Sequence, residues 1–226
     1  MNRLVIALAL FVTALPALAI PLSVLPWDGE IAARKFQIAH DKEVVEISYL
    51  HPAARSAPPI KLPADAKELR LITPDRKNAD GTPAAVPLVL PEGIKTPLLL
   101  IIPDKDAITG VRTLILEDDL QSFKWGTIRL MNVTPQPLVF RCDKDLRALA
   151  PGWNPIDVDP GGRTRNVEIL LYLKENLQQP VYSSVWEHRE DKRQLVFVVP
   201  SPDRSMGDVA FKIVPEIRLD AEVPAR

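Results

Sequence analysis

Residues 98–116 read LLLIIPDKDAITGVRTLIL, and residues 195–213 read LVFVVPSPDRSMGDVAFKI. Pro103 and Gly110 of the first stretch recur as Pro200 and Gly207 of the second, each 97 positions later. Solenoid repeats have periods of about 20 to 50 residues, so a period this long indicates a duplicated domain rather than a repeat array.

Shorter echoes extend the duplication toward the N-terminus. VVEISYLHP (44–52) resembles TIRLMNVTP (127–135), PIKL (59–62) resembles PIDV (155–158), and AVPLV (85–89) stands where YSSVW (182–186) stands later. The sequence therefore predicts two homologous modules, residues 20–119 and residues 120–226. The junction LEDDLQSFK (116–124) is short and carries Leu120 and Phe123, which favours docked modules over modules on a flexible Gly/Ser tether.

The first 19 residues have the pattern of a secretion signal. A basic start, MNR, precedes an apolar run, and Ala17-Leu18-Ala19 fits the small-x-small cleavage pattern. The apolar run Leu4–Leu15 is 12 residues long, short of the roughly 20 needed to span a bilayer. We expect cleavage after Ala19, an exported product in the periplasm or the extracellular space, and no membrane span in the mature chain.

Charge and cysteine content limit the possible partners. Arg3 is the one charged residue in the signal, so its removal changes the formal net charge from −1 to −2. Charges of both signs are interspersed, without the basic stripe that nucleic-acid binding requires. Cys142 is the one cysteine, which excludes an intramolecular disulfide, and its setting in VFRCD predicts a half-buried small apolar side chain on a strand.

Strand patterns dominate the chain. Val45, Ile47 and Tyr49 alternate with Glu46 and Ser48, and Val167, Ile169 and Leu171 also stand at every second position. Almost no apolar period of 3.6 is present. The runs PLLLII (97–102) and QLVFVV (194–199) are apolar throughout, which fits central strands covered on both sides or at a module interface. We predict an all-β fold, two tandem immunoglobulin-like β-sandwich modules after a signal peptide.

The stretch IRLMNVTPQPLVF (128–140) adds a resemblance. It fits a first strand of the type [IV]-R-x-x-N-x-[ST]-P, followed by a turn and a second strand. In this it resembles uncharacterised exported bacterial proteins built from immunoglobulin-like β-sandwiches. The resemblance implies a fold and no activity. By the echo above, the first module has EISYLHPAAR (46–55) in this place, without the corresponding Arg and Asn.

Catalytic and metal signatures are weak. His40, His51 and His188 lack partners at zinc spacing, which predicts solvated loop histidines. A Ser/His triad could use His188 with Ser183 or Ser184, but no G-x-S-x-G elbow accompanies them. Asp104 and Asp106 could begin a calcium loop, although Ile108 and Thr109 break the EF-hand pattern and favour turn-capping aspartates. We predict no catalytic residue, cofactor or metal site.

Aromatic residues of the second module are the remaining candidates for a ligand platform. Trp125, Trp153, Trp186 and Tyr182 could stack on sugars if exposed, whereas core packing is the more common role of large aromatics in sandwiches. Asn132-Val133-Thr134 fits a glycosylation acceptor or a polar turn.

Three functions remain open. The first is a non-enzymatic interaction protein whose partner is a protein or a cell-envelope component. The second is a carbohydrate-binding protein that uses these tryptophans, and the third is a hydrolase with its site in a cleft between the modules.

Overall fold

The computed structural model describes residues 19–49, 54–203, 205 and 207–218. The chain divides into two compact units, Met1–Leu116 (module 1) and Glu117–Arg226 (module 2), close to the expected junction. The expected signal peptide, apart from Ala19, lies outside the described residues. No helix in the described part of the chain is long and apolar enough to cross a membrane.

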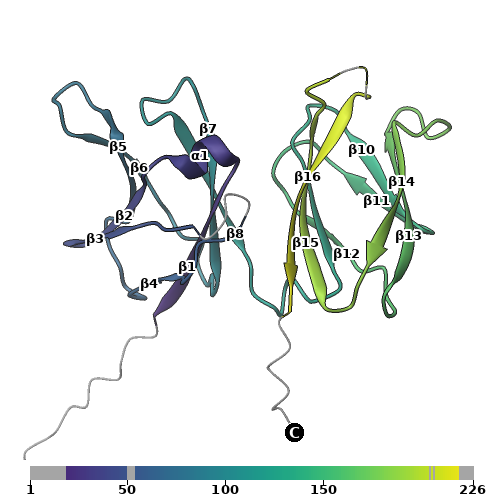
Figure 1. Ribbon diagram of the computed structural model, residues 1–226, viewed down its shortest axis with the longest axis horizontal. Helices are drawn as coiled ribbons and strands as arrows, with labels where there is room; N and C mark the ends of the chain where they lie inside the picture. Colours follow the sequence, from purple (N-terminus) through teal and green to yellow (C-terminus); the bar gives the residue numbers. More distant parts are fainter. Residues whose placement is uncertain (1–18, 50–53, 204, 206, 219–226) are drawn as a thin grey trace, which may run out of the picture. The chain divides into compact units, whose positions relative to one another are not determined.

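Module 1 consists of two four-stranded sheets, and the strand orders are β4-β1-β7-β8 and β3-β2-β5-β6 (Figure 1). Strand β1 pairs antiparallel with β4 and parallel with β7. The strands are β1 (Ile20–Pro26), β2 (Gln37–His40), β3 (Glu43–Glu46), β4 (Ile60–Leu62), β5 (Arg70–Lys77), β6 (Pro83–Pro87), β7 (Pro97–Pro103) and β8 (Val111–Glu117).

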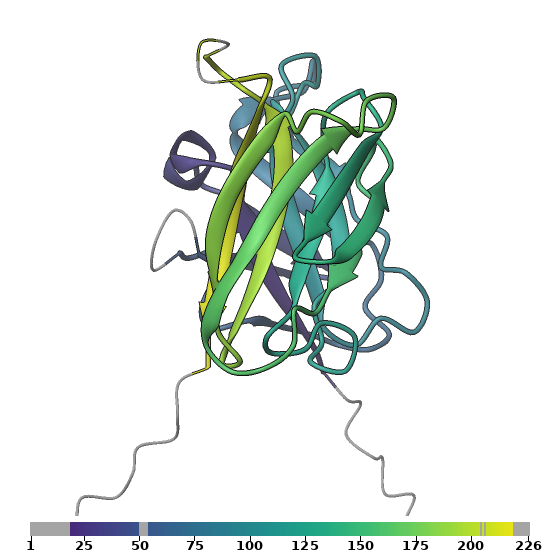
Figure 2. The ribbon, with the colours of Figure 1, turned by 90° about the vertical axis from the view of Figure 1, so that its right-hand side faces the viewer.

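Module 2 repeats this arrangement with the orders β12-β9-β15-β16 and β11-β10-β13-β14. Figure 2 shows the second of these sheets, teal to green, in front of β15 and β16. The strands are β9 (Ile128–Asn132), β10 (Leu138–Cys142), β11 (Asp145–Leu149), β12 (Ile156–Val158), β13 (Arg165–Leu173), β14 (Tyr182–His188), β15 (Lys192–Pro200) and β16 (Val209–Ile217).

The two modules match strand for strand, with β1 to β8 corresponding to β9 to β16 in order. The unusual parallel pair is also repeated, because β9 pairs parallel with β15 as β1 does with β7. The predicted all-β fold of two sandwich modules is confirmed. The strand order differs from the ABED and CFG sheets of antibody constant domains, so "immunoglobulin-like" describes the sandwich architecture alone.

One of the sequence echoes is wrong. VVEISYLHP (44–52) overlaps β3, an edge strand that corresponds to β11, whereas TIRLMNVTP (127–135) contains the central strand β9. The true counterpart of β9 is β1, directly after the expected cleavage site. The echoes on β4, β7 and β8 fall on the corresponding strands β12, β15 and β16. AVPLV and YSSVW fall on the corresponding strands β6 and β14 but are shifted by one residue, because the pairing makes Val86 the counterpart of Tyr182.

Each module has its own apolar core between its sheets. Strand β13 shows how the pattern produces it, because Val167, Ile169 and Leu171 point inward and are at most 1% exposed. The residues of β7 and β15 are buried on both faces over most of their length, as expected from their uninterrupted apolar runs.

A short helix, α1 (Gly29–Ala33), follows β1 and was not predicted. Its N-cap is Asp28, whose Oδ1 accepts a hydrogen bond from the Ile31 amide at 2.9 Å. Ile31 packs into the core of module 1. The sequence signal was an Asp before Gly-Glu-Ile, which is an N-cap followed by an acidic first turn.

Candidate functional site

Arg129, the arginine of the strand motif, fastens the inter-module linker to module 2. It is 7% exposed, and its Nε and Nη2 donate to both carboxylate oxygens of Asp157 at 2.7 Å each. Its remaining bonds go to the carbonyl oxygens of Glu117 at 2.6 Å and Ser122 at 3.1 Å. Four of the five N–H donors of this guanidinium bind a bidentate carboxylate and two carbonyls, which gives Arg129 a structural role.

Arg193 of β15 binds the same linker from the neighbouring strand. Its Nη1 donates to the carbonyl oxygens of Asp118 at 2.9 Å and Phe123 at 3.1 Å, and its Nε donates to Glu216 at 2.8 Å. The fully buried Phe123 ring lies 4.4 Å from the Arg129 guanidinium carbon and 4.9 Å from that of Arg193. We call Phe123 with these two arginines the arginine clamp. Cation–π contacts out of water add to its hydrogen bonds.

Asn132, the second polar residue of the motif, organises a turn. Its side chain is fully buried, donates to the carbonyls of Gln136 and Leu149, and accepts from the amide and hydroxyl of Thr134. The glycosylation reading fails for this reason, since the amide nitrogen is enclosed. In module 1 the positions of Arg129 and Asn132 correspond to Ser23 and Pro26, as the pairing of β1 with β7 and of β9 with β15 shows.

Two equivalent turns were missed in the sequence. HDKE (40–43) and CDKD (142–145) join β2 to β3 and β10 to β11, with Asp41 and Asp143 at φ of 48° and 51°. The backbone amide of Asp41 donates to the Lys67 carbonyl oxygen at 3.0 Å, and that of Asp143 donates to the Glu168 carbonyl oxygen at 2.8 Å. Asp tolerates this left-handed conformation, so the repeated Asp-Lys pair is a turn signal.

The tryptophan platform does not form as one surface. Trp186 and Tyr182 project from the same face of β14 toward the core of module 2, and Trp186 Nε1 donates to the Tyr182 hydroxyl at 3.1 Å. The Trp186 ring centroid is 5.2 Å from that of Phe211 and 6.3 Å from that of Phe140. Both residues are partly buried, and their rings are occupied by packing.

The other two tryptophans lie elsewhere in module 2. Trp125 is half-buried beside the linker, with the Arg193 guanidinium carbon 5.3 Å from its ring. Trp153 is half-buried in the loop before β12, 6.0 Å from the ring of Phe197. Neither stands on a strand with Trp186, so Trp125 and Trp153 pack separately from each other and from the Trp186–Tyr182 pair.

Two histidines are buried, which corrects the expectation of solvated loops. His188 is 4% exposed, and its Nε2 lies 3.2 Å from the Gly162 carbonyl oxygen. His40 is 2% exposed, and its two ring nitrogens lie 3.8 Å from an Asp41 oxygen and 3.7 Å from a Glu43 oxygen. Both residues end a strand, where adjoining turns cover the imidazole. His51 lies outside the described residues.

The suggested triad lacks the required geometry. Ser183 projects from the face of β14 opposite to His188 because side chains alternate along a strand. Ser184 shares the face of His188 but lies four residues, about 13 Å, along the strand.

The carboxylates are used in turns and ion pairs. The Asp104 side chain accepts from the Asp106 amide at 3.1 Å, and that of Asp159 accepts from the Gly161 amide at 2.9 Å, as expected for turn-capping aspartates. Asp157 is held by Arg129. Within the described ranges, no group of three or more His, Cys, Asp or Glu side chains is placed to hold a metal ion.

Cys142 ends β10, as predicted, but it is 2% exposed and belongs to the core of module 2, so it is more deeply buried than the expected half-buried side chain. Burial raises the pKa of its thiol to about 11, with a further contribution from the charge of Asp143. A thiol with a raised pKa is a poor nucleophile at neutral pH.

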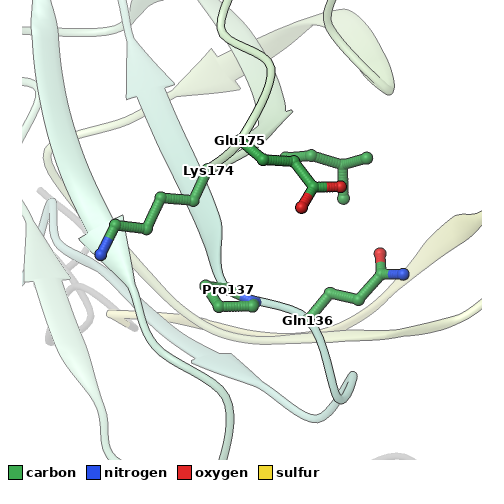
Figure 3. A pocket seen from close by; sticks show the side chains of 5 residues that line it. Gln136, Pro137, Lys174 and Glu175 are labelled. Carbon is green, nitrogen blue, oxygen red and sulfur yellow. The ribbon is translucent and has the colours of Figure 1, made fainter.

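One surface hollow of module 2, about 400 Å³, lies where β13 ends and the turn before β10 begins. Its lining includes Gln136, Pro137, Lys174 and Glu175, and in Figure 3 the Lys174 side chain points away from those of Gln136 and Glu175. Because the charged groups diverge, this hollow has no convergent set of polar groups.

A hollow of about 490 Å³ opens in module 1 between β6 and β8, the edge strands of its two sheets. Apolar and small residues of the two strands form much of it, including Ala84, Val86, Val111 and Thr113. The turn between β7 and β8 contributes Asp104 and residues 107–109. We call it the β6/β8 hollow.

Module 2 fills the corresponding space with aromatic rings. Val86 of β6 is the counterpart of Tyr182 of β14. Val86 pairs with Leu71 and Tyr182 pairs with Leu171, and these two leucines pair in turn with the equivalent residues Ile38 of β2 and Phe140 of β10. Thr113 of β8 is likewise the counterpart of Phe211 of β16. Each lies three residues after the residue whose carbonyl closes the preceding turn, Gly110 or Asp208. The Tyr182 and Phe211 ring centroids are 4.6 Å apart, so these rings close the edge of module 2 that module 1 leaves open.

No known protein family and no curated protein matches this chain. The geometry of the two modules is therefore the basis for a functional proposal.

Proposed function

We propose that this chain is an exported, non-enzymatic interaction protein of the cell envelope or the extracellular space, and that module 1 contacts the partner. The observation that carries the proposal is the β6/β8 hollow, an open, largely apolar side of one module that is filled in its duplicate. An exposed apolar hollow is a common interaction site, whereas module 2 packs Tyr182 and Phe211 at the corresponding place.

The polar side chains support the same proposal. The buried Arg129, Arg193 and Asn132 bind backbone carbonyls of the linker and a turn. These buried groups hold the fold together and are not available to a partner. Sheet edges and surface hollows are the sites that we propose for binding.

The N-terminal sequence supports export. Strand β1 begins at Ile20, directly after the Ala17-Leu18-Ala19 pattern, so cleavage after Ala19 would leave every strand of module 1 intact.

Mass spectrometry of the protein from its native host tests export, and we expect a mature N-terminus at Ile20 in the envelope or extracellular fraction. An Ala17→Asp/Ala19→Asp variant, which destroys the cleavage pattern, is the control and should retain its leader. Intact Met1 on a protein confined to the cytoplasm would contradict export.

Site-specific photo-crosslinking in the same host tests the contact surface. A crosslinking residue at Ala85, which lines the hollow, should yield a discrete adduct. One at the exposed Ser183 of β14 is the matched control and should not. Equal adducts at both positions, or none at Ala85, would contradict the assignment of module 1 as the contact surface.

A further inference from the structure

We infer that the β6/β8 hollow binds an extended peptide segment of a partner protein, which inserts one aromatic side chain and pairs its backbone along β8. The inference deepens the proposed function and rests on it for its biological setting. Three features of module 1 support it: the shape of the hollow relative to module 2, the backbone at the edge of β8, and the charge near one end of the hollow.

The shape of the β6/β8 hollow favours an aromatic side chain in the peptide. Where module 2 places Tyr182 and Phe211 in ring contact, module 1 has the much smaller Val86 and Thr113 and a hollow of about 490 Å³. The walls remain apolar at Ala84 and Val111, each 1% exposed. An aromatic ring from outside would restore the packing that module 2 makes with its own rings.

The backbone at the edge of β8 favours an extended conformation of the peptide. Strand β8, Val111–Glu117, is the last strand of its sheet and contains no proline, so a strand can be added along its outer side. Strand β6 has Pro83 and Pro87 at its two ends, which makes it the poorer edge for pairing. In an added strand, alternate side chains would face the hollow.

The charge at the Gly110 end of the hollow favours an acidic residue near the aromatic residue of the peptide. At the Gly110 end of the hollow, Arg34 pairs with Asp75 at 2.8 Å and donates to the Thr109 carbonyl. The exposed Arg76 guanidinium lies 3.5 Å from where a Gly110 Cβ would be. Asp104 and Arg112 also line the hollow, so three arginines face two aspartates. This positive excess favours an acidic residue in the peptide.

The test is panning of a random 12-residue peptide phage library against the purified chain from residue 20 onward. We expect enriched peptides to share an aromatic residue with β-branched neighbours and an acidic residue nearby. Synthetic peptides from this set should lose about tenfold or more in affinity when the aromatic residue becomes alanine. Hydrogen exchange with bound peptide should show added protection in β8.

Two variants locate the binding. Val86→Tyr/Thr113→Phe installs the side chains of module 2 and should abolish peptide binding. Arg76→Glu changes only an exposed charge, and it should weaken binding of acidic peptides while leaving the melting temperature unchanged, which keeps the test valid if the double variant folds poorly. The control Lys144→Glu, in the exposed turn of module 2, should bind like the parent.

Several outcomes would overturn the inference. These are peptides without an aromatic residue, peptides that bind the filled variant as well as the parent, and protection in module 2 instead of β8. A concentration-dependent dimer that disappears on filling the hollow would identify a second copy as the occupant instead. Since panning uses purified protein, a chain that binds such peptides but is not exported would contradict the proposed location and leave the peptide site standing.

Discussion

Trp186→Ala should destabilise module 2 by about 3 kcal/mol. Complete removal of a core Trp or Phe side chain costs about 3 to 5 kcal/mol. Trp186 is only partly buried and lies on the edge strand β14, which reduces that figure. Loss of the contact with Phe211 adds about 0.5 to 1.5 kcal/mol, and loss of the hydrogen bond to Tyr182 adds about 1 kcal/mol.

Calorimetry of the complete exported chain would measure this change. For a domain of about 100 residues, 1 kcal/mol shifts the melting temperature by about 4 to 8 °C, so the transition of module 2 should fall by about 12 to 24 °C. Val185→Ala is the matched control, because Val185 directly precedes Trp186 on β14, faces outward and is 62% exposed. It should change stability by less than about 0.5 kcal/mol.

An unchanged transition in Trp186→Ala would refute the packing argument. If that variant also lost binding to polysaccharides that the parent binds, the ring would be a stacking platform, and the carbohydrate-binding hypothesis would replace the interaction hypothesis.

Three further predictions concern the clamp, a turn and the thiol. Arg193→Ala should cost about 3 to 5 kcal/mol in urea unfolding and speed hydrogen exchange around Phe123, because buried carbonyls lose their donor. The hydrogen bond from Arg165 holds the pKa of Asp143 below its usual range. The ionised Asp143 therefore stabilises the fold above about pH 4, and this stabilisation is lost as the pH falls below that value. The difference in unfolding free energy between the parent and Asp143→Asn should shrink on acidification. With a thiol pKa of about 11, Cys142 should react with iodoacetamide at pH 8 about 100-fold more slowly in the folded chain than in urea, as mass spectrometry would show.

The duplication was readable where both copies keep the same strand type. Strands β7 and β15 are central and buried on both faces, so both are continuous apolar runs, and both end in a proline, Pro103 and Pro200. The first strand could not be matched in this way. In module 2 it carries Arg129 and Asn132, which bind the linker and a turn, whereas in module 1 Ser23 and Pro26 take these positions.

The candidate residues show a similar limit. Sequence alternation placed Trp186 and Tyr182 on one face of β14 but could not tell which face is inward, because both neighbouring faces carry polar and apolar residues. Arg193 looked like one charge among many. Its burial depends on Asp118 and Glu216, 75 and 23 residues away in the sequence, and no local pattern encodes such a meeting.

The arginine clamp also means that the two modules cannot be separated at an arbitrary point. The carbonyls that bind Arg129 and Arg193 belong to Glu117, Asp118, Ser122 and Phe123, all of which precede the first strand of module 2. A fragment starting at Lys124 would retain all eight strands and the carboxylates of Asp157 and Glu216, yet the two buried arginines would lose their four carbonyl acceptors. A fragment ending at Leu116 would lose nothing comparable. The linker is thus the N-terminal part of module 2, and any dissection of this protein has to cut before it.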